Sequence, residues 1–389
     1  MPRSLPPLLA AVLVIYSLHQ LLTSVVAPLA RELSLTTTQL SLVFTAASVA
    51  TTLASPIWGL LLDAAGVRPV LGAGLALCVA GPAGFAAAVA FGLDETLTPD
   101  LAFTMVLVFR GLLFGAGLAS VLVAALAVAG LSTHGVVERT RAISFVGAAQ
   151  GLGIVLGPVA AGVLAVTSLW LPLYVAPVVA LLVAVLVLVT VRPVERSPQP
   201  VEVRPRELVP AFGAGFLLYL SLAILQTVVV YLAADRVRGT SAALEGLLFA
   251  SGIGLLLAQG LLVPLLKWSP ARLVRIGSPV AVAGCALLAV SPSSALMSLA
   301  FLVVSLGIGL AITGFGAVAS LGVGSGRQGL MAGLVTATGG LTFIIGPMLS
   351  ALLYEVAPIA PVIAAGLAAL LATGLSLVPA ARHVPHSVG

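Results

Sequence analysis

Charged residues are scarce in this sequence: only 7% of its 389 residues are Asp, Glu, Lys or Arg. A soluble domain normally carries about 25% charged residues, so a water-soluble fold of this length could not cover its surface with so few. Aromatic residues are also few, at 5%, whereas hydrophobic residues make up 60% of the chain and the mean hydropathy is +1.24. These values exclude an ordinary soluble protein and indicate a polytopic membrane protein.

Cysteine is nearly absent, and both Cys78 and Cys285 lie inside apolar runs. We expect them to pack as small apolar residues rather than to form a disulfide. No nucleophile–base set and no metal-ligand cluster is visible, so the sequence does not indicate an enzyme, a metal site or a cofactor. The net charge of +5 comes from bases in short loops rather than on one face, so a nucleic-acid partner is not expected either.

Long apolar runs are the main feature of the sequence. A membrane-spanning helix needs about 20 apolar residues, and twelve such runs can be counted. Because the runs are continuous and do not alternate, helices are expected rather than strands. The first run is longer than the about 7–15 residues of a signal-peptide core, which predicts an uncleaved span. The runs cover roughly 7–30, 38–62, 69–92, 101–130, 142–166, 172–191, 209–233, 243–266, 273–291, 294–321, 329–355 and 358–380.

The basic residues predict the orientation of these spans. With a cytoplasmic N-terminus, thirteen Lys and Arg residues fall on the cytoplasmic side and three on the other, which is a strong positive-inside bias. We therefore predict an inner-membrane protein with both termini in the cytoplasm. A charged segment divides the chain, so the expected parts are a first half at 1–191, a linker at 192–208, a second half at 209–380 and a tail at 381–389.

The two halves show signs of an internal repeat. Gly157-Pro158 in the fifth run matches Gly346-Pro347 in the eleventh, and the loop after the second run has a counterpart at residues 263–272. Two six-helix repeats around a site at the membrane midplane are the architecture of a carrier that alternates access between the two sides. The expected fold class is therefore an all-α integral membrane protein with twelve helices in two pseudo-repeat halves.

The most informative stretch is the charged turn between the second and third runs. It contains Gly59, Asp63, Gly66 and Arg68, with the spacing G-x-L-x-D-x-x-G-x-R. This pattern resembles the loop signature of the major facilitator superfamily. The resemblance implies a twelve-helix transporter in which this acid and base hold helix ends together when the cytoplasmic side is closed.

The turn departs from the family pattern at Ala64 and Val67, where bases are usual, and its second-half copy has Lys267 in place of the acid and Pro270 in place of the glycine. We therefore expect a gate held mainly by the N-terminal half.

An arginine lies inside the fourth run. Placing Arg110 in the membrane costs about 2.5–3.5 kcal/mol on insertion scales, so it should face the bundle interior. The sequence Arg110-Gly111-Leu112-Leu113-Phe114-Gly115 resembles the superfamily motif whose arginine takes part in proton coupling. A structural role in binding backbone carbonyls is the alternative.

The fifth run resembles the antiporter motif of superfamily exporters. The match G-x-x-x-G-P-x-x-x-G is carried by Gly153, Gly157, Pro158 and Gly162. Small residues let another helix pack closely, and the proline bends the span. The resemblance implies export by antiport and places the chain beside the twelve-span drug–proton antiporters.

The buried polar residues suggest the chemistry of the cavity. The twelve acids all lie in loops or near the ends of runs, whereas carriers of cationic drugs usually use a buried acid. The buried ionisable groups are Arg110 and His19, whose reference pKa of about 6.5 suits reversible protonation, although packing is the commoner role of a lone histidine. Neutral candidates for the substrate cavity are Gln20, Thr23, Gln150, Tyr219, Gln226 and Gln259.

These observations predict a secondary active transporter that exports a small, partly apolar compound, a drug or a metabolite, in exchange for protons. Neutral, zwitterionic or anionic substrates are expected over hydrophobic cations, and a monomer in the lipid bilayer is expected from the resemblance. A facilitator or importer of a small metabolite such as a sugar or organic acid is the alternative, and a non-transporting scaffold or sensor is a third.

Overall fold

The structure, a computed structural model, describes residues 4–33, 35–94, 96–133, 135–192, 205–237 and 241–377. Regular secondary structure within these ranges is helical. Twelve of the helical segments are long and apolar enough to cross a membrane, as the sequence predicted. Most of the expected linker at 192–208 and the whole tail at 381–389 lie outside the described residues.

The first six spans are formed by helices α1 to α7. Their bounds are α1 Leu5–Glu32, α2 Thr37–Ala65, α3 Val67–Leu93, α4 Pro99–Val106, η1 Leu107–Leu113, α5 Phe114–Leu131, α6 Val136–Thr167 and α7 Leu171–Thr190. Helices α4, η1 and α5 follow one another without a break and make one span.

The last six spans are formed by helices α8 to α14. Their bounds are α8 Pro205–Val237, α9 Ser241–Leu256, η2 Leu257–Leu262, α10 Val263–Leu266, α11 Pro270–Ala289, α12 Ser294–Leu321, η3 Ser325–Arg327, α13 Gln328–Val356 and α14 Ala360–Leu377. Here α9, η2 and α10 together make one span. The short turn between α11 and α12 confirms the expected split between the ninth and tenth spans.

Local sequence explains where several helices begin and end. Thr36 and Gln39 form a reciprocal capping box at the start of α2, in which the backbone N–H of Thr36 donates to Gln39 Oε1 at 2.9 Å. Gly66 has φ 94°, which lets α2 turn sharply into α3. At the corresponding turn of the second half Lys267 has φ 50°, a left-handed conformation that costs a non-glycine residue about 1–2 kcal/mol.

Two spans contain π-helical segments that the sequence did not predict. Segment η1 interrupts the fourth span and carries Arg110, and η2 interrupts the eighth span and carries Gln259. A π-helical turn redirects the side chains that follow it, and such turns are frequent at functional sites. The two interruptions therefore draw attention to these two polar residues.

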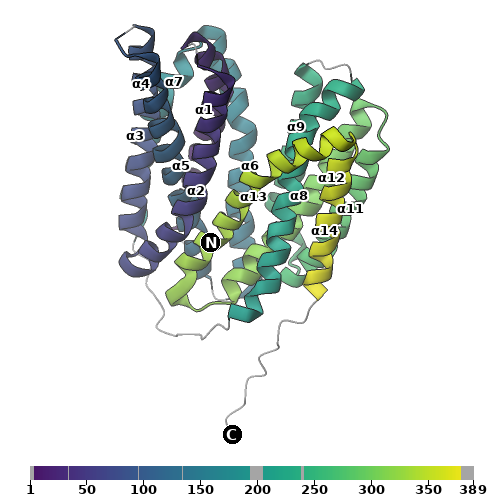
Figure 1. Cartoon of the computed structure of the whole chain (residues 1–389). Coiled ribbons are helices and arrows are strands. Elements are labelled where there is room, and N and C mark those ends of the chain that lie inside the picture. The colour runs from purple at the N-terminus through teal and green to yellow at the C-terminus, as the bar shows by residue number, and fades with distance from the viewer. Residues whose placement is uncertain are drawn as a thin grey trace.

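The helices form two groups that stand side by side (Figure 1). One hydrophobic core is built almost entirely by residues of α1 to α7, and a second by residues of α8 to α14. We call the end of the molecule where α2 turns into α3 and α12 turns into α13 the Asp63 end. Helix α13 begins there beneath the first group and leans toward the second group (Figure 1).

The closest seam between the groups runs along α2 and α13. Gly329 lies against Gly59, where a methyl group on either residue would collide with the carbonyl of the other. Glycine contacts continue along the seam at Gly333, which packs against Ser55, and at Gly340, which packs against Thr52. The two helices therefore approach at backbone distance over several turns.

Candidate functional site

A cavity of about 900 Å³ lies between the two groups of helices. Its walls come from α1 and α6 on one side and from α8 and α9 on the other. The lining residues of α1 and α6 lie from the middle of these helices onward, and those of α9 all precede η2, in the first part of the eighth span. The cavity therefore opens toward the end of the molecule opposite Asp63. A volume of this size suits a small organic molecule.

The cavity wall is mostly apolar with a few hydrogen-bonding groups. Gln20 and Ser24 of α1, Gln226 of α8 and Ser251 of α9 supply the polar atoms. The Ser251 hydroxyl also pairs with the hydroxyl of Ser305 at 2.6 Å. Valine, leucine, isoleucine, phenylalanine and glycine residues form most of the remaining wall. Such a surface can bind a molecule with an apolar body and a small number of hydrogen-bonding groups.

The glycine motif of α6 has two structural roles. A methyl group at Gly153 would lie 2.6 Å from the carbonyl oxygen of Leu13, and one at Gly157 would lie 2.5 Å from the carbonyl oxygen of Ser17. These two glycines therefore let α6 pack against the backbone of α1. Gly162 has no atom within 4 Å of the position a methyl group would take, and it lines the cavity together with Pro158.

Arg110 is fully buried beside α1. Its Nη2 donates to Thr23 Oγ1 at 2.7 Å and to the His19 carbonyl at 3.3 Å, and its guanidinium carbon lies 5.5 Å from the centre of the Phe114 ring. Within the described chain, Nε and Nη1 of Arg110 and Nδ1 of His19 have no hydrogen-bond partner. Thus the two buried ionisable residues predicted from the sequence are brought together, and a positive charge stands behind the α1 wall.

The six predicted cavity residues are divided among several places. Gln20 and Gln226 line the cavity. Thr23 accepts from Arg110, and Gln150 interacts with Tyr16.

The other two predicted cavity residues contact C-terminal helices. Tyr219 packs edge-on against Phe315, with ring centres 6.4 Å apart. Gln259 approaches the Gly309 carbonyl at 3.5 Å and lies close to Gly147 of α6. Of the six residues predicted for the cavity, two therefore line it, one binds Arg110, and three contact other residues of the protein.

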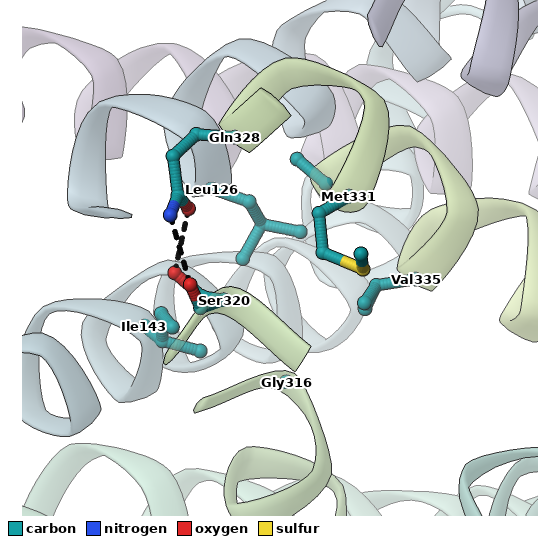
Figure 2. Close-up of a pocket in the computed structure, with 8 residues that line it drawn as sticks. Leu126, Ile143, Gly316, Ser320, Gln328, Met331 and Val335 are labelled. Carbon is teal, nitrogen blue, oxygen red and sulfur yellow. Dashed lines mark hydrogen bonds between the residues drawn. The ribbon is translucent and has the colours of Figure 1, made fainter. Parts of the chain in front are cut away.

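A packed layer closes the Asp63 end of the molecule. A small pocket of about 10 Å³ lies there, lined by side chains of α5, α6, α12 and α13. Figure 2 shows the residues around it. The Gln328 side chain spans this layer: its Nε2 donates to the Ser320 carbonyl at 2.8 Å, and the Ser320 hydroxyl donates to its Oε1 at 2.8 Å. The pocket is lined by Leu126, Ile143, Gly316, Ser320, Gln328, Met331, Ala332 and Val335.

Asp63 binds the beginning of α13. Its two carboxylate oxygens accept hydrogen bonds from the backbone N–H groups of Gly329 at 2.8 Å and Leu330 at 2.7 Å. These N–H groups belong to the first turn of α13, where a helix has free donors and a partial positive charge. The acid of the first half thereby fastens a helix of the second half.

The bases at this end also bind backbone carbonyls. Arg68 Nη2 donates to the Leu188 carbonyl of α7 at 3.0 Å, within its own half. Arg139 Nη1 donates to the Ser320 carbonyl of α12 at 3.2 Å, across the two halves. In the sequence, Arg139 is one of the thirteen bases that indicate orientation, and no motif marks Gln328 or Ser251 as functional residues. The position of Arg139 at the start of a span could have suggested a role at this end of the molecule. Its partner Ser320 could not be predicted, because it lies 181 positions away.

The comparisons with known proteins agree with this architecture. The sequence model of the Major Facilitator Superfamily matches residues 8–347. The solved structure of the human organic anion transporter MFSD10 (TETRAN) is similar, with a TM-score of 0.79 and 18% identity over 97% of this chain and all of that one.

Two further solved structures, one described as outward-facing and one as outward, share the fold. A bacterial homologue of the iron transporter ferroportin in an outward-facing state has a TM-score of 0.78 and 15% identity over 96% of this chain and 98% of that one. The transporter FucP in the outward conformation has a TM-score of 0.76 and 16% identity over 96% of this chain and 99% of that one. No curated protein sequence matches significantly.

Proposed function

The chain belongs to the major facilitator superfamily, and on this premise we propose that it exports a small, partly apolar compound in exchange for protons. Family membership makes the protein a multi-pass membrane transporter of small molecules rather than an enzyme. The direction, the substrate class, the coupling ion, the drug–proton antiporter branch and a monomeric state in the inner membrane are the proposal.

The chemistry of the cavity supports the substrate class. Its wall offers amide and hydroxyl groups at Gln20, Ser24 and Gln226 on an apolar surface, and its described lining residues include no carboxylate. Arg110 adds a buried positive charge next to this wall, because its partners His19 and Thr23 alternate along α1 with the lining residues. A positive potential favours neutral, zwitterionic or anionic compounds and disfavours hydrophobic cations.

The conformation supports alternating access. The cavity opens away from the Asp63 end, while that end is closed by the contacts of Asp63 and Arg139 across the two halves. The positive-inside bias of the basic residues puts the Asp63 end in the cytoplasm. The structure is then the outward-open state of the cycle, in which an exporter releases its substrate.

Proton coupling is motivated by the α6 glycine motif and by the pair of His19 and Arg110. The motif supplies the tight α1–α6 contact at Gly153 and Gly157, next to the histidine. A proton that binds near Arg110 adds positive charge beside the cavity. Antiport requires that the proton and the substrate exclude each other from this region, for example by using the same hydrogen-bonding groups, because the added charge alone would strengthen the binding of an anion.

Transport in inverted membrane vesicles tests the proposal. The panel contains carboxyfluorescein as an anion, ethidium as a permanent cation, and one neutral and one zwitterionic compound, each with and without an imposed pH gradient. We expect accumulation of the uncharged or anionic compounds, driven by the gradient and lost in Arg110→Met. Rapid ethidium export that Arg110→Ala leaves unchanged argues against the substrate class, and counterflow that a pH gradient never converts to accumulation argues against proton coupling.

Facilitated transport or import of a sugar or organic acid is the second candidate. The absence of a carboxylate among the described cavity residues favours it, because no obvious proton carrier then lines the substrate path. The same vesicles separate the two: a facilitator equilibrates the compound in both directions and does not respond to the gradient.

A further inference from the structure

We propose that Arg139 is a second gating residue beside Asp63, and that Gln328 positions the segment that both of these residues bind. The contacts converge on residues 320–330, which contain the end of α12, the turn with η3 and the start of α13; we call this segment the clasp. The first half grips the clasp twice, through Asp63 at one end and Arg139 at the other. This inference deepens the proposed alternating access and rests on it.

The two grips have opposite charge, and each matches the helix end that it binds. Asp63 faces the N-terminal turn of α13, where backbone N–H groups give a partial positive charge. Arg139 faces the last turn of α12, where the Ser320 carbonyl belongs to the partially negative end. Both interactions join a full charge to a helix terminus of the second half.

Arg139 is placed for this role by its own half. Its Nη2 donates to the Thr133 carbonyl at 3.0 Å and its Nε approaches the Thr133 hydroxyl at 3.4 Å. These contacts leave Nη1 aimed across the gap at Ser320. Because the guanidinium is planar and held by two groups, its third contact has a fixed direction.

Gln328 holds the clasp in shape. Its side chain is buried and ties the start of α13 to the end of α12 through the carbonyls of Ser320 and Val323, at 2.8 and 3.0 Å. The Ser320 carbonyl therefore accepts from both Gln328 and Arg139, and the residue after Gln328 donates to Asp63. Gln328 thus fixes the two helix termini relative to each other. It is a positioning residue, because it acts through the backbone that the charged residues bind.

The first half also leaves room for this side chain. A methyl group at Gly130 of α5 would collide with the Gln328 amide and would lie 2.8 Å from the Ser320 hydroxyl. The clasp therefore docks against a surface of α5 that is shaped for it. From this geometry we expect the contacts of Asp63 and Arg139 to depend on Gln328. Without the hydrogen bonds of Gln328, the ends of α12 and α13 are no longer held in the positions that Arg139 and Asp63 bind.

The test measures how often the Asp63 end opens. Met331 lines the small pocket at this end and is buried, so we place a reporter there as Met331→Cys in a background with Cys78→Ala and Cys285→Ala. A maleimide on a large polyethylene glycol is added outside inverted vesicles, where it reaches the protein from the cytoplasmic side. The rate of the mass shift reports opening, needs no substrate, and stays measurable even if the export proposal fails.

Three variants are compared with the reporter alone. Arg139→Gln should label about tenfold faster, which corresponds to about 1.4 kcal/mol of lost closure. Gln328→Leu should label at least as fast, and adding Arg139→Gln to it should raise the rate less than threefold further. Arg141→Gln is the matched control, because Arg141 lies two residues along α6, is exposed and packs over Phe145 instead; it should change the rate less than twofold.

The proposal fails if Arg139→Gln labels no faster than Arg141→Gln. It also fails if Arg139→Gln multiplies the rate tenfold in the Gln328→Leu background, because Arg139 then holds the clasp independently of Gln328. If Arg139→Gln does not fold, Arg139→Lys takes its place: it keeps the charge but loses the planar fork, so labelling faster than in Arg141→Gln supports the proposal and a wild-type rate contradicts it.

Discussion

Replacing Asp63 by asparagine removes a charge from the closed end of the transporter while keeping the shape of the side chain. Its carboxylate accepts from Gly329 and Leu330 at 2.8 and 2.7 Å, and a hydrogen bond to a charged group contributes about 1.5–3 kcal/mol. Asparagine keeps one acceptor oxygen, so one bond is lost and the other loses its charge. Because the site is only partly buried, we take a loss of about 2 kcal/mol.

A loss of about 2 kcal/mol lowers the ratio of closed to open molecules at this end about 30-fold. Spin labels at Val137 and Ala271 report the distance between the halves at the Asp63 end, and labels at Thr96 and Val290 report it at the opposite end; all four positions are exposed. In Asp63→Asn the first distance should lengthen and the second should shorten. Asp63→Glu, which keeps the charge, should stay nearer to wild type. Unchanged distance distributions in Asp63→Asn would refute the reasoning.

The remaining predictions concern packing and the cavity. Gly157→Val should lower the yield of folded protein on size-exclusion chromatography, because the added atoms meet the α1 backbone, whereas Gly162→Val should fold normally and alter transport alone. Arg110→Met should raise or leave unchanged the melting temperature, since it removes a buried charge, and should abolish transport; retained transport would assign Arg110 a structural role. Gln226→Leu should change which compounds are transported, as measured by competition in vesicles, whereas Gln259→Leu should affect them less because it lies between helices.

The sequence predicted the fold well because its strongest signals are local. Each span needs only a continuous apolar run, and the split between α11 and α12 followed from a Ser-Pro-Ser-Ser stretch at 291–294. The glycines of α6 were also found from their spacing. Their separate roles were not, because Gly157 meets α1 while Gly162 faces open space, and only the packed structure distinguishes the two.

The site was predicted less completely because its partners are distant in the chain. The sequence pointed to Asp63, but its partners are backbone groups 266 and 267 residues away, and a backbone donor leaves no mark in the sequence. The six polar residues expected in one cavity were divided by side-chain direction, and for Gln259 this direction is set within a π-helical turn that the sequence did not predict. In the sequence Arg139 served only as evidence for orientation, so its contact with Ser320 of the second half was not predicted.

The seam between α2 and α13 has a consequence for the speed of the transport cycle. Where Gly59 meets Gly329 the two helices touch through main chain, so this contact freezes few side-chain rotamers beyond that of Asp63, whereas long side chains lose about 1.5–2 kcal/mol each when they are ordered. Parting this contact therefore releases little disorder, and rejoining it requires little search among side-chain conformations. In the proposed alternating-access cycle the two halves would then part and rejoin at this line without a slow repacking step.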